Sequence, residues 1–125
     1  MLRRFIITES EADLTSHAGI GLIGMALNQC TDRAGDAAAV SPLRSDAMPH
    51  ATILSSYIAL LCLGKSDFEA ITGFREDPYF REALGLDRVP SEGILRQRMD
   101  AHAAAYQGVV EAAAIEFLRR SGARI

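Results

Sequence analysis

The sequence contains no tryptophan, and phenylalanine and tyrosine together make up only 6% of its 125 residues. The core must therefore be built mainly from alanine, leucine and isoleucine, a mixture that favours close-packed helices. About half of the residues are hydrophobic, which excludes a disordered chain. We expect a single domain over residues 1–125 that is mainly α, a compact helical bundle with one short N-terminal strand.

Cysteine and histidine are also scarce. The two cysteines, Cys30 and Cys62, lie in apolar helical patterns without Cys-x-x-Cys spacing, so we expect buried, reduced thiols. The three histidines are scattered without ligand spacing or a paired nucleophile: His17, His50 and His102. The sequence therefore predicts no metal site, no cofactor and no acid–base catalysis by histidine.

Long hydrophobic runs are absent. The longest, Ile53–Leu63, is about half of what a membrane span requires, and it is interrupted by Ser55 and Ser56. The N-terminal run Phe5-Ile6-Ile7 is too short for the apolar region of a signal peptide. We expect a cytoplasmic protein with no membrane partner.

An excess of positive charge is lacking as well. The formal net charge is -3, and the second half carries nine basic residues interleaved with ten acidic ones. The overall field therefore repels phosphate, and any contact with nucleic acid must come from a local face.

Turn and cap residues divide the chain into two parts. Residues 1–46 are expected to form an arm with a strand at 2–8, a first helix and a connection over 31–46 that is rich in Asp, Gly and Ser. Thr15 or Ser16 is a suitable N-cap for that helix, which should run to about Cys30.

Residues 47–125 are expected to form the helical core. The apolar segment from about Ala51 to Leu63 is the candidate for a central buried helix, which Gly64 ends. Ser66 is the expected N-cap of the next short helix.

Two further helices follow in this core. Asp77 caps a helix with Pro78 at its first position, and Gly85 stops it. Ser91 caps a helix that begins at Glu92 and is expected to run into the last one. In that last helix the apolar residues recur at helical spacing: Tyr106, Val109, Val110, Ala113 and Phe117.

The segment Gly19–Gly24 matches the G-x-G-x-x-G pattern of dinucleotide-binding folds. That fingerprint requires a strand that leads directly into the glycine turn and a second strand about 20 residues further on. Residues 9–17 separate the candidate strand from Gly19, and 31–46 contains no second strand. We interpret these glycines as small residues that permit close helix packing.

The segment Ser91–Asp100 has the polarity of a DNA-recognition helix. On a helical projection its apolar residues share one side, and the other side carries Gly93, Arg96, Gln97 and Asp100. Such a helix docks through its apolar side and presents long polar side chains to the groove. Arg98 lies at the edge of the apolar side, where an internal ion pair and a DNA contact are both open. An ordinary solvated helix face has the same pattern.

Several spaced motifs resemble those of one protein family. Gly64-Lys65-Ser66-Asp67-Phe68-Glu69 is followed by Asp77-Pro78, Ala83-Leu84-Gly85 and Pro90-Ser91, and Leu14–Gly19 precedes them. Together they resemble the N-terminal region of bacterial insertion-sequence transposases of the Asp-Asp-Glu (DDE) class.

The resemblance implies a role in transposition. In that family an all-helical N-terminal region precedes a ribonuclease H-like domain, whose Asp-Asp-Glu triad binds two Mg²⁺ ions and cuts and joins DNA. This chain stops at Ile125, where that domain would be expected to begin, so a truncated reading frame is one account of it and no catalytic residue is carried over. The expected partner is double-stranded DNA, in particular the terminal inverted repeats.

The predicted DNA contacts come from a helix-turn-helix-like unit over residues 77–100. Arg96 and Gln97 are predicted to contact the groove, and Ser91 and Arg98 the phosphate backbone. The chain alone is not expected to be an enzyme, since its acids lie at helix starts and in loops rather than in a cluster that holds two metals.

A second hypothesis, from another class, is a protein-interaction module without autonomous DNA binding. The small-residue helix Ala18–Leu27 and the apolar last helix could build a homodimer or dock on a full-length transposase, which would regulate transposition by forming mixed oligomers.

Overall fold

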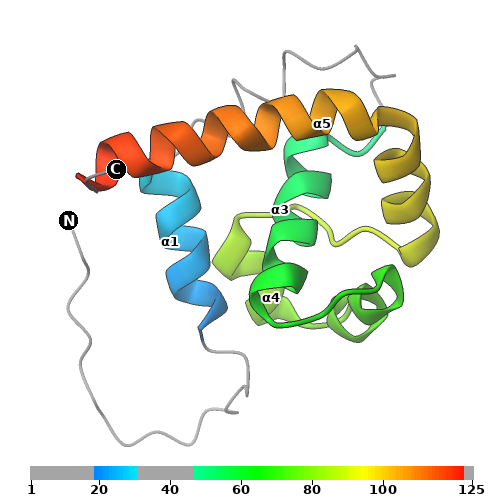
Figure 1. The fold of residues 1–125 in the computed structure, drawn as a ribbon. Coiled ribbons are helices and arrows are strands. Elements are labelled where there is room, and N and C mark those ends of the chain that lie inside the picture. Colours follow the sequence, from blue (N-terminus) through cyan, green and yellow to red (C-terminus); the bar gives the residue numbers. More distant parts are fainter. Residues whose placement is uncertain (1–18, 31–46, 123–125) are drawn as a thin grey trace, which may run out of the picture.

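The computed structural model describes residues 19–30 and 47–122, and within these ranges every regular element is a helix. The elements are α1 (Ile20–Cys30), α3 (His50–Cys62), the 3-10 helix η1 (Phe68–Phe74), α4 (Pro78–Leu84) and α5 (Glu92–Ser121). The prediction of a mainly α, compact fold is confirmed (Figure 1). The strand predicted at 2–8, the capping residues Thr15 and Ser16 and the connection 31–46 lie outside the described residues.

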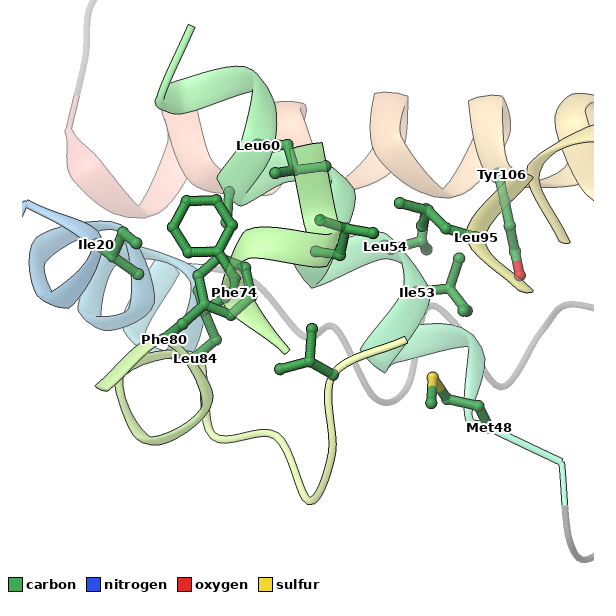
Figure 2. Close-up of a cluster of buried hydrophobic side chains, with 13 residues drawn as sticks. Ile20, Met48, Ile53, Leu54, Leu60, Phe74, Phe80, Leu84, Leu95 and Tyr106 are labelled. Atoms are coloured by element: carbon green, nitrogen blue, oxygen red, sulfur yellow. The ribbon is translucent and has the colours of Figure 1, made fainter. Parts of the chain in front are cut away.

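Helix α3 forms the centre of the bundle, as its apolar sequence predicts. Its side chains Ile53, Leu54 and Leu60 are buried and face the neighbouring helices (Figure 2). The helix ends in a Schellman motif: Gly64 has a left-handed φ of 78°, and the N–H of Lys65 donates to the carbonyl of Leu60 at 2.9 Å. The predicted end at Gly64 is therefore confirmed.

The boundaries of the two short elements follow from their caps. At η1 the prediction was wrong by one residue, because Asp67 rather than Ser66 is the N-cap, and its Oδ1 accepts the N–H of Ala70 at 3.0 Å. Asp67 combines an extended backbone with a short carboxylate that reaches the first turn. In α4 the Oδ1 of Asp77 accepts the N–H of Tyr79 at 2.9 Å, and Gly85 ends the helix at a φ of 68°, both as predicted.

Helix α1 packs closely against α4 because it carries glycine where the two backbones meet. A Cβ atom on Gly24 would lie 1.9 Å from the carbonyl oxygen of Ala83, and one on Gly21 would lie 2.7 Å from the hydroxyl of Tyr79. A side chain at position 24 would meet the α4 backbone and move α1 away from α4, whereas at position 21 the side chain of Tyr79 could move aside. The interpretation of the glycines as a packing device is confirmed at Gly24, and a Cβ on Gly19 would meet nothing within 4 Å.

Helix α5 runs from Glu92 to Ser121 as two helical segments that meet at a bend at His102, whose backbone is non-helical at φ -123° and ψ 21°. The segment before the bend packs Leu95 into the core, and the longer segment after it crosses α3 and α1 (Figure 1). Gly122 ends the helix at a φ of 72°. The helix from Glu92 therefore does run into the last one, as predicted, but with a kink between the two.

The predicted burial of Cys62 is wrong, because its side chain is exposed at the last turn of α3. The neighbouring Leu61 is also 50% exposed, so this turn projects beyond the helices that cover the rest of α3. The side chain of Cys30 lies outside what the structure describes. No helix among the described residues is both long and apolar enough to span a membrane.

Candidate functional site

The start of α5 holds three of the four residues predicted to contact DNA on its surface side. Ser91 is the N-cap, and its Oγ accepts the N–H of Ile94 at 3.2 Å. The predicted capping role of Ser91 is confirmed. Its oxygen accepts in this cap, and its O–H can still donate to a phosphate.

Arg96 projects outward, as the helical projection predicts, but its guanidinium is not isolated. Its Nη2 donates to the Oε1 of Glu92 at 2.8 Å, one turn earlier on the same helix. The guanidinium carbon also lies 5.4 Å from the ring centre of Phe68 in η1, within cation–π range. The Arg96 side chain remains 55% exposed. The ring and the carboxylate thus hold a positive group at the surface in a defined position.

The rest of this face is polar and exposed, and it is not basic. Gln97, Gly93 and Asp100 are exposed beside Arg96, as predicted. The carboxylates of Glu92 and Asp100 flank the one guanidinium, so the local field offers little attraction to a phosphate. Arg96 and Gln97 are the two predicted contact residues that the structure brings together on the surface.

Arg98 points to the other side and lies in an internal hydrogen-bond network. Its Nη1 donates to the carbonyl oxygen of Met48 at 2.7 Å, and its Nη2 lies 2.8 Å from the Nδ1 of His50 and 3.4 Å from the hydroxyl of Tyr106. Its predicted role at the DNA backbone is therefore corrected. The alternative, an internal ion pair, is also wrong, because the partners of Arg98 among the described residues are a carbonyl, an imidazole and a hydroxyl. Arg98 binds the segment before α3 to both segments of α5.

The geometry of this network gives the Nδ1 of His50 a role. A guanidinium only donates hydrogen bonds, so this nitrogen accepts from the Nη2 of Arg98. The hydroxyl of Tyr106, 2.6 Å from the same nitrogen, then donates to it. Burial raises the pKa of Tyr106, and this outweighs the opposite effect of Arg98. Tyr106 is thus held neutral as a donor.

The ring of His102, at the bend of α5, completes the cluster. It packs edge-on against His50 with ring centres 5.0 Å apart, and 5.5 Å from the ring of Tyr106. In the sequence the histidines are scattered. No local pattern predicts that His50 and Tyr106 lie together, because they are 56 residues apart. Among the described residues no group of three or more His, Cys, Asp or Glu side chains is placed to hold a metal.

An apolar groove of about 280 Å³ lies between α3 and the longer segment of α5. Tyr57, Ile58 and Leu61 line it from α3, and Met99, Ala103 and Val110 line it from α5. Leu61 and Val110 are 50% and 42% exposed, so the rim is apolar as well. The sequence identified Val110 as part of the apolar side of the last helix, but not that α3 stops short of covering it.

Comparison with protein-family models, with curated proteins and with solved structures found no match for this chain.

Proposed function

We propose that this chain is a non-catalytic module of a DDE-class transposase, which takes part in binding DNA at the ends of the element. The proposal is supported by the resemblance carried by residues 64–100. The observation that carries it is the exposed pair Arg96 and Gln97 at the start of α5, opposite the buried Leu95. In this proposal α4 and the first segment of α5 form the helix-turn-helix-like unit, with α5 in the major groove.

The two side chains have different parts in the proposed contact. Arg96 would leave Glu92 and bind a phosphate instead. Little stabilising free energy is lost, because an exposed ion pair of this kind contributes only about 0.3–0.5 kcal/mol. Gln97 has an amide that donates and accepts, which suits the edge of an adenine. Gly93 leaves the backbone open to close approach, since an added Cβ there would meet nothing within 4 Å.

The proposal is tested by titrating the protein with a duplex of the terminal inverted repeat and a scrambled duplex at two salt concentrations. Replacing Arg96 by alanine should weaken binding to both duplexes and lower the salt slope by about one. Replacing Gln97 by alanine should mainly reduce the preference for the repeat, by about fivefold to a hundredfold, which corresponds to 1–3 kcal/mol per base contact.

The matched control is Arg75→Ala, which removes an exposed arginine at the end of η1 that is not among the predicted contact residues. If Arg96→Ala and Arg75→Ala bind both duplexes as tightly as the unaltered chain, the proposed DNA surface is wrong.

The groove between α3 and α5 favours a second candidate function, protein interaction without autonomous DNA binding. Its lining is almost wholly apolar, and an open apolar groove between helices suits the apolar side of a partner helix. In the transposase context that partner is another copy of the chain or the full-length enzyme. The variant Leu61→Glu would place a charge on the rim, and loss of co-purified or self-associated protein, with DNA binding intact, would favour this function over the first.

A further inference from the structure

The outward side of α5 after the bend carries mostly small and apolar side chains, and its long charged side chains are those of Glu111 and Arg119. On the helical projection, one stripe contains Ala104, Gly108, Ala112, Ile115 and Leu118, all of them exposed. Ile115 is 66% exposed, the largest exposed fraction of any large hydrophobic residue in the described part of the chain. Tyr106, Val109 and Ala113 lie on the opposite side and are wholly or partly buried. This outward stripe therefore faces solvent and not the core.

The two charged residues in this stripe are placed symmetrically around Ile115. Glu111 precedes Ile115 by four residues and Arg119 follows it by four, so each lies about 6 Å from it along the helix axis. The partner of Glu111 is an amide, since its Oε1 accepts from the Nε2 of Gln107 at 3.2 Å. An acidic and a basic group thus stand at equal distances on either side of one apolar residue.

Near Arg119, at the C-terminal end of the stripe, the positive charges outnumber the negative ones. Glu116 accepts hydrogen bonds from both Arg119 and Arg120. The hydrogen bonds from Arg120 and then from Arg119 lower the pKa of Glu116, so its carboxylate stays ionised and neutralises one of the two guanidinium groups. The side chain of Arg119 is 74% exposed. Its guanidinium can therefore meet a second acid without leaving Glu116 unpaired.

We infer that a second copy of this chain pairs with the first through this stripe, with the two α5 helices antiparallel and Ile115 at the two-fold axis. In that register each Glu111 faces Arg119 of the other copy. Leu118 faces Ala112, so a large side chain meets a small one, and Gly122 faces Gly108, where the helices can approach closely. The charges and the shapes are therefore self-complementary.

The opposite, parallel arrangement is excluded by the same charges. It would place Glu111 against Glu111 and Arg119 against Arg119, and like charges opposite each other destabilise a helix pair. The pairing is independent of the DNA surface at Arg96, which lies before the bend of α5.

The contact is short, so the dimer should be weak. Residues 104–122 span about 28 Å of helix, and one pair of helix faces of that length buries less than about 1,200 Å², the weak end of specific interfaces. We expect dissociation in the micromolar range, tightened by low salt because the two ion pairs are exposed.

Sedimentation equilibrium of the full chain, over a range of concentrations at low and high salt, tests the pairing. The unaltered chain should be a dimer at high concentration and low salt and should dissociate on dilution. Ile115→Glu, which brings two carboxylates together at the axis, should abolish the dimer. The matched control Ile94→Glu alters an exposed isoleucine in the same helix before the bend and should leave the dimer unchanged.

Charge reversal tests the register. Glu111→Arg or Arg119→Glu alone should each weaken the dimer by about tenfold, since two like-charge contacts replace two ion pairs. The double variant, which exchanges the two charges, should restore affinity to within about threefold. A chain that stays monomeric at every concentration overturns the inference, as does a dimer that Ile115→Glu leaves intact or that the double variant fails to restore.

Discussion

At the residue scale, Arg98 and Arg96 show that two arginines two positions apart on one helix can have unrelated roles. Arg96 is exposed and contacts Glu92 and the ring of Phe68. Arg98 forms hydrogen bonds with Met48, His50 and Tyr106 inside the fold. Their spacing turns them about 200° apart around α5. The helical projection predicted the outward position of Arg96. Two of the three partners of Arg98 lie about 50 positions earlier in the sequence, so no local pattern indicates them.

Arg98→Ala should therefore destabilise the fold strongly. It removes the donor to the carbonyl oxygen of Met48 and one of the donors to His50, which costs about 1–3 kcal/mol. Arg96→Ala, its neighbour on the exposed side, should cost less than about 1 kcal/mol. Urea unfolding at neutral pH measures both, and equal losses for the two variants would show that the network does not contribute as described.

The raised pKa of Tyr106 leads us to predict how the free energy of unfolding changes at alkaline pH. Burial raises its pKa above 10.0 in the folded protein, so the unfolded chain loses this proton first as the pH rises. The stability from the neutral phenol is therefore complete below about pH 10 and is lost as the pH rises towards the folded pKa. Urea midpoints should fall more steeply above pH 10 for the unaltered chain than for Tyr106→Phe.

The difference in phenolate absorbance between those two proteins follows Tyr106 directly, because Tyr57 and Tyr79 are common to both. A phenolate signal from Tyr106 that titrates at pH 10.0, with the helical content unchanged, would contradict the buried, donating hydroxyl.

At the element scale, most helix boundaries were predictable because local chemistry sets them. Four helix ends are set by backbone geometry and by contacts with the nearest residues, so they can be predicted from the sequence: those at Gly64, Asp77, Gly85 and Ser91. Ser66 was the wrong cap since two adjacent residues were both competent, and the backbone selected Asp67. The prediction that Cys62 is buried was wrong, because whether other helices cover the last turn of α3 depends on the tertiary fold and not on the local sequence.

The contact between α1 and α4 gives the element-scale prediction. Gly24→Ala should destabilise the protein by about 1–3 kcal/mol, because the added methyl group overlaps the carbonyl of Ala83 and the helices must separate. Gly93→Ala is the matched control, at a helical glycine with open space around it, and should be neutral or slightly stabilising. Thermal unfolding compares the two, and a Gly24→Ala variant as stable as Gly93→Ala would show that α1 is not packed against α4 at this point.

At the scale of the whole molecule, burial is unevenly distributed. Seven residues of α3 are buried, whereas α5, although much longer, buries only Leu95 and Tyr106. The sequence predicted the central place of α3 from its apolar composition. It did not predict that the end of α5 extends past the core, since the apolar residues there are as regularly spaced as those of a buried helix.

This uneven burial predicts where the structure opens first. Amide hydrogens of α3 should exchange slowly, near the rate set by global unfolding, and those of residues 114–121 should exchange much faster in the monomer because few buried contacts hold that end. If α5 pairs with a second copy, protection of residues 108–122 should rise with protein concentration while that of α3 stays constant. The control is Ile115→Glu, for which protection at the end of α5 should not depend on concentration. Equal protection of α3 and residues 114–121 in dilute protein would mean that the end of α5 is held by contacts other than those described, and the stripe around Ile115 would not be a free surface.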